Sequence, residues 1–475
     1  MRRIWRIIKI VLVRVRERGI TTAISSAIRV LKYYGLLGLR HKIRSLVGSY
    51  TNPGTAACGQ PRRFAEWPWS VPMESCQENG GHFDLLFVGH EASRSGAPKA
   101  LLEMAKEFAR RPDFSVWVCS MTGGLLEEEF QQSVRYLNIL SLAVSRGWSD
   151  QEALCELLSS FRNQGPLYAV IVNTVAVPNA HNICGELNIP VLSWVHELPR
   201  SIEECYGGSA TMREIVENSK RIIVPAQFCK DILRQTYGID EDKIRVAYYG
   251  VKVGRLGSKR ERARKEVRKE LGIPEDSLIV LACGLAGLRK GTDLFVDVAR
   301  HVLNLGKSKH IHFIWVGDAQ SWNTDNRYQE DAGPFYGYVK FVGETPDPER
   351  YFVASDVFLL SSREDPCPLV SMEAIEYGLP VIAFDGAGGA PELFKYGFGV
   401  VVPYLDTQRM ARETIRLLSF SSREKSHRRV GALSKELSWD RCAESVMGIL
   451  RADYGFHPTR RRKRSARSLD QGRTG

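Results

Sequence analysis

Residues 356–384, DVFLLSSREDPCPLVSMEAIEYGLPVIAF, decide the fold of this chain. The stretch begins with a strand-like apolar run and ends with a glycine turn and a second buried strand, 381–384. Two carboxylates eight residues apart, Asp365 and Glu373, bracket the strand-to-helix junction between them. Open α/β sheets bind ligands at such junctions, beyond the carboxyl ends of their strands. Because carboxylates accept hydrogen bonds from hydroxyl groups, the pair indicates a site for a sugar or a ribose, unless both acids are simply solvated charges.

The same alternation of strand and helix runs outward from this stretch through most of the chain. In the first half, apolar strand-like runs lie at 84–89, 116–119, 168–172, 191–195 and 221–224. After a charged stretch, the runs resume at 278–284, 311–317, 339–343, 357–360 and 381–384. Alternating strands and helices predict parallel sheets covered on both faces. We therefore expect an α/β protein with two Rossmann-like domains, 83–250 and 251–437, facing each other across a cleft.

The net charge of +12 is concentrated at the two ends of the chain. Residues 1–50 hold twelve Lys or Arg and one Glu, and residues 455–475 hold seven basic residues and one Asp. A nucleic-acid enzyme would carry its positive charge on the folded face, so we expect no nucleic-acid partner. Basic end segments suit an anionic membrane surface, although a merely solvated charge run is the alternative.

The ten cysteines are scattered, with no Cys-x-x-Cys pair and no zinc-type spacing. This usage indicates a reducing compartment, and we expect a cytoplasmic protein with no metal site. No run of 18 or more apolar residues is present, so the sequence predicts no membrane-spanning helix.

The N-terminal segment 1–50 has the pattern of a basic amphipathic helix. Ile4, Ile8 and Val11 share one face of a helical wheel with other apolar residues, and most of the arginines lie opposite. This pattern predicts a segment lying on the inner face of the cell membrane, with docking on the body or on a partner protein as alternatives. Residues 51–82 are a linker by composition, and 455–475 a basic disordered tail.

A second candidate element is the glycine loop that joins a strand to a helix at 284–293. Gly284 and Gly291 allow close approach of the backbone, and the helix that follows favours a phosphate at its N-terminus. Arg289 and Lys290 add positive charge suited to a diphosphate leaving group. A glycine turn alone is weak evidence, because most such turns are structural.

Three strand ends of the first half supply further candidates. His196 follows the run 191–195 directly, and Asn173 follows 168–172. Gly96 and Ala97 belong to the loop after the first strand. A lone histidine is more often structural, but its place at a strand end favours a functional role.

The string 361–374, followed by Gly378-Leu379-Pro380-Val381, resembles the signature of the group 1 glycosyltransferases (family 4), which are retaining enzymes of the GT-B fold. Lys290-Gly291-Thr292-Asp293 resembles a second element of that family. The chain departs from the family pattern in three places: Asp365 stands for the usual Glu, Cys367-Pro368 for Phe-Gly, and Leu285 for an Arg. The resemblance covers about residues 83–450 and implies that residues 438–454 form a helix crossing back to the first domain.

The resemblance also implies roles for the candidate residues. Glu373 would bind the ribose of a nucleotide-sugar donor, and Asp365, or its neighbour Glu364, the transferred sugar. Lys290, with Arg289 in place of the missing arginine, would contact the diphosphate, and backbone around Cys367 and Leu369 the donor. His196 would face the reacting sugar.

These roles predict a retaining glycosyltransferase that moves a sugar from a nucleotide-diphosphate donor to a lipid-linked or polysaccharide acceptor in cell-envelope or surface glycan synthesis. No cofactor beyond the donor is expected, because cationic side chains replace a metal. The alternatives are another enzyme on the same scaffold, such as an epimerase or a glycogen-type synthase, and a non-catalytic scaffold that binds nucleotide sugars at the membrane.

Overall fold

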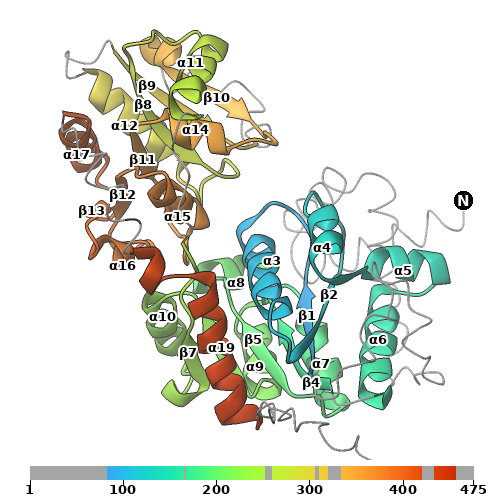
Figure 1. Ribbon diagram of the computed structural model, residues 1–475. Coiled ribbons are helices and arrows are strands. Elements are labelled where there is room, and N and C mark those ends of the chain that lie inside the picture. The colour runs from blue at the N-terminus through green and yellow to red at the C-terminus, as the bar shows by residue number, and fades with distance from the viewer. Residues whose placement is uncertain are drawn as a thin grey trace, which may run out of the picture.

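The computed structural model describes residues 83–164, 167–251, 259–304, 310–318, 333–419, 430 and 433–455. The predicted amphipathic segment and linker lie outside the described residues, as does the basic tail beyond Gly455. Figure 1 shows two lobes, each built around one parallel sheet, with the chain passing between them. The two predicted α/β domains are confirmed.

The N-terminal domain holds a seven-stranded parallel sheet in the order β3-β2-β1-β4-β5-β6-β7. Its strands are β1 (Phe83–Gly89), β2 (Phe114–Ser120), β3 (Arg135–Asn138), β4 (Leu167–Val172), β5 (Val191–Trp194), β6 (Arg221–Val224) and β7 (Ile244–Val246). Its helices are α3 (Gly96–Ala109), α4 (Glu127–Ser133), α5 (Ile139–Arg146), α6 (Asp150–Gln164), α7 (Pro178–Glu186), α8 (Pro199–Cys205), α9 (Gly208–Asn218), α10 (Gln227–Tyr237) and the 3₁₀ turn η3 (Glu241–Lys243).

The C-terminal domain holds a six-stranded parallel sheet in the order β10-β9-β8-β11-β12-β13. Its strands are β8 (Leu278–Cys283), β9 (Ile311–Val316), β10 (Val339–Gly343), β11 (Val357–Leu360), β12 (Val381–Phe384) and β13 (Gly399–Val402). Around it lie α11 (Lys259–Leu271), α12 (Thr292–Asn304), η4 (Gly333–Tyr338), α14 (Glu349–Ala354), α15 (Leu369–Glu376), α16 (Pro391–Phe394) and α17 (Thr407–Ser419).

Strand β1 shows how alternation builds two layers. Leu85 and Phe87 pack in the core layer that also holds α3, whereas Leu86 and Val88 pack in the layer that also holds α6. All four side chains are completely buried, as expected for a central strand of a sheet covered on both faces. Burial of such side chains stabilises the fold by roughly 1.5–3 kcal/mol each.

The sequence prediction missed three strands, β3, β7 and β13, and each lies at an edge of its sheet. They are only three or four residues long. Strands β3 and β7 carry the arginines Arg135 and Arg245, and Val401 of β13 is 40% exposed. Short, partly exposed strands lack the long apolar run that marks a central strand, because one side of them has no neighbour.

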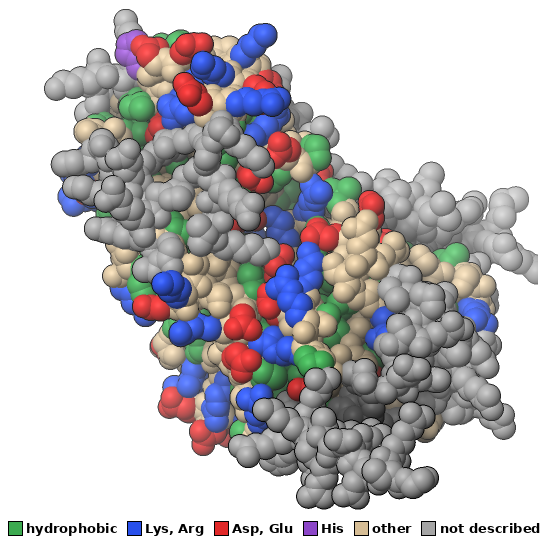
Figure 2. Space-filling view, in the orientation of Figure 1, with side chains coloured by type: hydrophobic (Ala, Val, Ile, Leu, Met, Phe, Trp, Pro, Cys, Tyr) green, Lys and Arg blue, Asp and Glu red, His purple; other side chains and the backbone are tan. Residues whose placement is uncertain are grey.

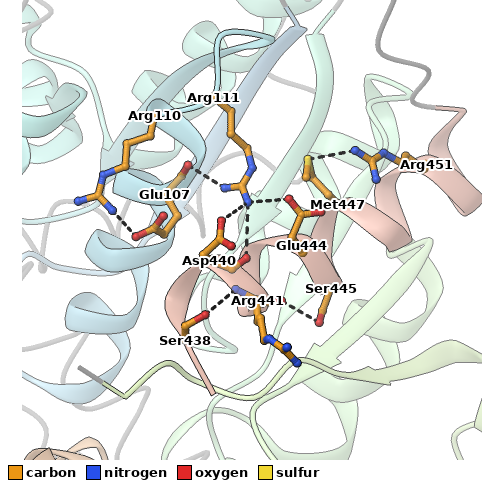
Figure 3. Close-up of polar contacts among 10 residues, drawn as sticks. All are labelled: Glu107, Arg110, Arg111, Ser438, Asp440, Arg441, Glu444, Ser445, Met447 and Arg451. Carbon is orange, nitrogen blue, oxygen red and sulfur yellow. Dashed lines mark hydrogen bonds and ion pairs between the residues drawn. The ribbon is translucent and has the colours of Figure 1, made fainter. Parts of the chain in front are cut away.

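The last described helix, α19 (Trp439–Tyr454), packs on the N-terminal domain although it follows the C-terminal domain in sequence (Figures 1 and 3). It buries Trp439, Cys442, Ala443, Val446, Met447, Ile449 and Leu450. At its start, Arg111, just beyond α3, donates to Asp440 at 2.8 Å and to Glu444 at 2.9 Å (Figure 3). At its end, the Tyr454 hydroxyl donates to the Val191 carbonyl at 2.6 Å. Polar contacts at both ends thus hold the buried face against the N-terminal sheet and α3.

None of the described helices has both the length and the apolar character that crossing a membrane requires.

Candidate active site

The glycine loop after β8 lies against the loop after β11. The φ angle of Gly291 is +66°, and a Cβ atom there would lie 1.9 Å from the Ser361 carbonyl oxygen. The φ angle of Gly284 is +140°, and a Cβ atom there would lie 3.3 Å from Cε of Lys290. At Gly291 only glycine tolerates both the backbone conformation and the space, so this residue lets the two loops meet, whereas at Gly284 it is the positive φ angle that favours glycine.

The two loops bring Lys290 and Asp365 together. The Lys290 ammonium contacts a carboxylate oxygen of Asp365 at 2.5 Å, and Asp365 is only 6% exposed. The backbone N–H of Asp365 donates to the Ala387 carbonyl at 2.8 Å, which fixes the carboxylate-bearing residue. A Cβ atom on Gly388 would lie 1.7 Å from the Asp365 carbonyl oxygen, so this support also depends on glycine. The result is a fixed, shielded pair of opposite charges at the ends of β8 and β11.

Two arginines tie the same loops together. Arg363 forms a two-pronged ion pair with Asp293, with contacts of 2.7 and 2.6 Å, and Arg289 donates to the Glu364 carbonyl at 2.9 Å. Arg289 remains exposed, so its charge is available at the surface of the site. The Lys290–Asp293 element and the 361–365 loop therefore form one unit, which sequence inspection treated as two separate motifs.

The remaining acidic residues face the opposite domain. Glu373, on α15, accepts from Lys99 on α3 at 2.8 Å. Glu364 accepts from the Ser201 backbone N–H at 3.3 Å and from its hydroxyl at 3.2 Å. Arg94 donates to the Pro346 carbonyl at 2.8 Å. Figure 2 shows basic and acidic side chains side by side where the lobes meet. Of the predicted donor residues, Glu364 and Glu373 thus lie at the contact between the domains.

The surroundings of Glu364 and Lys99 raise the pKa of both groups. Burial raises the pKa of the Glu364 carboxyl above its ordinary value, and its bonds from Ser201 only partly offset this. For Lys99, burial is the largest influence and would lower the pKa of the ammonium, but the charge of Glu373, the hydrogen bond to it and the nearby Cys283 together outweigh burial, and the pKa is raised. The Lys99 ammonium therefore keeps its charge at neutral pH.

His196 lies at the N-terminal side of this contact, with both ring nitrogens engaged. Nε2 is 2.7 Å from the Asn173 side-chain oxygen, and Nδ1 contacts the Tyr249 hydroxyl. The Asn173 amide nitrogen donates to the Ala97 carbonyl at 3.0 Å. Burial lowers the pKa of His196 to about 3, and the nearby His90 adds to the shift. The imidazole is therefore neutral at physiological pH.

Three of the predicted residues take up other positions. The Cys367 side chain is 9% exposed and packs in the apolar core, and Leu369 begins α15 and packs against that core. The predicted backbone contacts to a donor at these two positions stay a prediction. Gly96 is exposed at the start of α3, and a Cβ atom there would meet nothing within 4 Å.

Sequence reasoning missed Lys99 and Ser201. Each lies near the start of an N-terminal-domain helix and contacts an acid more than 160 positions later, Glu373 or Glu364. The only local signal for Lys99 was its place just after the first loop, and Ser201 had none. The part of the chain that the structure describes contains no group of three or more His, Cys, Asp or Glu residues placed to hold a metal ion.

Two family models match this chain where the two domains lie. Residues 94–255 match the model described as Glycosyltransferase Family 4, and residues 277–419 match Glycosyl transferases group 1. The chain belongs to the group 1 glycosyltransferases. The second match contains the glycine loop, the Lys290–Asp365 pair and Glu373, so the group 1 signature and the charged unit coincide.

Curated relatives and solved structures place this group 1 glycosyltransferase in a wider set. It is 30% identical to a glycogen synthase of Thermotoga petrophila over 46% of this chain and 48% of that protein. It is 24% identical to a D-inositol 3-phosphate glycosyltransferase of Xylanimonas cellulosilytica over 70% of this chain and 76% of that protein. The chain thus spans about half the length of the glycogen synthases it matches.

Solved structures confirm the GT-B architecture of this group 1 glycosyltransferase. The Anabaena protein Alr3699/HepE, in complex with UDP and glucose, matches with a TM-score of 0.64 at 18% identity, over 78% of this chain and 100% of that one. The glycosyltransferase WaaG matches with a TM-score of 0.57 at 14% identity, over 78% and 100% of the two chains.

Proposed function

We propose that the protein transfers a sugar from a nucleotide-diphosphate sugar to a lipid-linked or glycan acceptor, with retention of the anomeric configuration. The observation that carries the proposal is the Lys290–Asp365 pair at the carboxyl ends of β8 and β11, beside Glu373 at the domain contact. This is where open α/β sheets bind their ligands. UDP sugars are the first donors to test, since HepE was crystallised with UDP-glucose.

Each residue of the unit has a chemical task in this proposal. Lys290 and the exposed Arg289 stabilise the negative charge that develops on the departing diphosphate, in place of a divalent cation. Asp365 and Glu373 accept hydrogen bonds from hydroxyl groups of the sugar and of the ribose. His196 is neutral and engaged at both ring nitrogens, so it orients groups at the reacting centre and carries no charge.

Glu373→Gln tests the donor site directly. We expect UDP or UDP-glucose to raise the unfolding midpoint of the wild-type protein, and this rise to be lost in the variant. A ligand at a hundred times its Kd stabilises the folded state by about 2.7 kcal/mol, which a thermal-shift measurement detects. The variant loses the negative charge that is proposed to hold the ribose hydroxyls and that pairs with Lys99.

Glu376→Gln is the matched control, because it makes the same change three residues further along α15. It should keep the response to nucleotide. If no UDP, GDP or ADP compound shifts the wild-type protein, or if both variants respond as the wild type does, this donor site is wrong. Transfer activity lost in Glu373→Gln with the fold kept would also exclude the non-catalytic scaffold.

We also propose that the enzyme works at an anionic membrane surface, on the basis of the basic amphipathic sequence in residues 1–50. Replacing Arg6, Lys9 and Arg14 together with glutamine is expected to weaken binding to anionic vesicles about 100-fold, since each cation near the surface contributes roughly 1 kcal/mol. Vesicle co-sedimentation measures this. Glutamine at Arg262, Lys265 and Lys269, exposed on α11, removes the same charge elsewhere and should change little. Equal losses from both triples would refute a specific role of the N-terminal segment.

A further inference from the structure

The two segments that connect the domains, 249–251 and 437–439, lie next to His196. The chain leaves the N-terminal domain after Val251, and it returns at Leu437. These two passages touch, because the Val251 N–H donates to the Leu437 carbonyl at 2.7 Å. A Cβ atom on Gly250 would lie 2.1 Å from the Trp439 backbone nitrogen. The two segments that connect the domains therefore pass each other at a distance that only glycine allows.

Tyr249 connects this junction to His196. Its ring stacks on Trp439 with centroids 5.5 Å apart and planes 27° apart. Its side chain is only 3% exposed, and its hydroxyl contacts Nδ1 of His196. The rings of Trp194 and His196, with centroids 4.8 Å apart, complete the packing. A buried aromatic residue thus has one face on the domain junction and its polar end on the candidate catalytic histidine.

The hydrogen bonds fix which nitrogen of His196 carries the proton. A backbone carbonyl only accepts, so the Ala97 carbonyl orients the Asn173 amide with its nitrogen toward Ala97. The Asn173 oxygen then faces Nε2 and must receive a hydrogen from it. In a neutral ring the other nitrogen, Nδ1, is an acceptor, and the Tyr249 hydroxyl is its donor.

We propose that Tyr249 is a positioning residue, which holds His196 in the neutral Nε2–H form and passes the geometry of the domain junction to the active site. The proposal rests on the proposed function, because it concerns the orientation of a group at the reacting centre. Because the Tyr249 ring stacks on Trp439, a displacement of the 437–439 segment would also displace the hydroxyl that is bonded to Nδ1.

Among the described residues, three titratable groups act on His196 or bond to it. His90 acts on it by its charge, Glu197 accepts from the His196 backbone N–H at 3.0 Å, and Tyr249 contacts the ring. Burial raises the pKa of Tyr249 well above its ordinary value, so its hydroxyl keeps its proton. We therefore expect the Tyr249 hydroxyl to donate to Nδ1 throughout the range from pH 5 to 8.

Tyr249→Phe in the full-length protein tests the proposal. Nitrogen NMR of histidine-labelled protein reports the tautomer, and the His196→Asn variant identifies the His196 signals. We expect the wild-type signals to show the neutral Nε2–H form at every pH from 5 to 8. In Tyr249→Phe the Nδ1 signal should shift, and the ring should take up a proton at higher pH than in the wild type. Turnover of the donor sugar should fall about tenfold, the cost of one hydrogen bond, with KM for the donor unchanged.

Tyr248→Phe is the control, since it removes a neighbouring hydroxyl that donates to Glu392 at 2.8 Å and does not contact His196. Unchanged His196 signals in Tyr249→Phe overturn the proposal whatever happens to activity. So does a wild-type imidazole that is protonated at pH 6, a result that needs no variant to fold. If the NMR results are as expected but no nucleotide sugar is turned over, the positioning stands and the proposed function fails.

Discussion

Replacing Lys290 with alanine is expected to lower the rate of sugar transfer by about 10²–10³-fold, the usual cost of removing one charge-stabilising group from a preorganised site. Lys290 is mostly buried and fixed at 2.5 Å from Asp365, so its charge needs little reorganisation when the diphosphate departs. The exposed Arg289 shares this task but makes up for little of the loss, because solvent screens its charge. Steady-state turnover of a UDP sugar measures the effect.

Two controls separate this loss from a loss of folding. Lys269→Ala removes an exposed lysine of α11 in the same domain and should leave turnover unchanged. Urea unfolding of Lys290→Ala shows whether the now unpaired Asp365 destabilises the domain. The double variant Lys290→Ala, Asp365→Asn removes that unpaired charge. A folded Lys290→Ala protein that turns over at the wild-type rate would contradict the assignment of Lys290 to the leaving group.

Replacing Trp439 with alanine is expected to lower the free energy of unfolding by about 3–5 kcal/mol, the usual range for a buried aromatic side chain. The Trp439 side chain is 7% exposed, stacks on Tyr249, and begins the helix that crosses back to the first domain. Its loss opens a cavity at the start of α19. Urea denaturation followed by circular dichroism measures the change.

The neighbouring Asp440 supplies the control for Trp439. Its side chain is 68% exposed and pairs with Arg111, and exposed ion pairs contribute about 0–1 kcal/mol. Asp440→Ala should therefore shift the unfolding midpoint only slightly. Equal shifts in the two variants would show that α19 is held by its polar contacts and that its buried aromatic start contributes little.

The sequence predicted what depends on neighbours along the chain. Central strands such as β1 and β12 contain apolar runs, 85–88 and 381–384. Lys290, Asp365 and Glu373 lie in or beside local motifs at strand ends. Edge strands such as β7 were not predicted, because they are short and only partly buried. The position of such a strand is determined by the strand it pairs with, and this pairing produces no apolar pattern that the sequence would reveal.

The partners of the site residues were predictable only within one domain. Lys290 and Asp365 lie on loops of the same sheet, whose topology follows from the strand order. The contact of Lys99 with Glu373 depends on how the two domains meet, and no spacing within either domain encodes that. The contact of Tyr249 was not predictable from the sequence, because it depends on Trp439 of the returning helix.

The position of helix α19 at the end of the chain also determines the order in which the two domains can be completed during synthesis. The ribosome makes the whole N-terminal sheet before it makes the C-terminal domain, and residues 439–454 come after both. Until they emerge, the surface of the first domain that receives Val446 and Leu450 stays uncovered, and Arg111 lacks its two acids. The first domain to be synthesised is therefore the last to be completed, and its exposed apolar face is where a nascent chain of this protein most needs protection from aggregation.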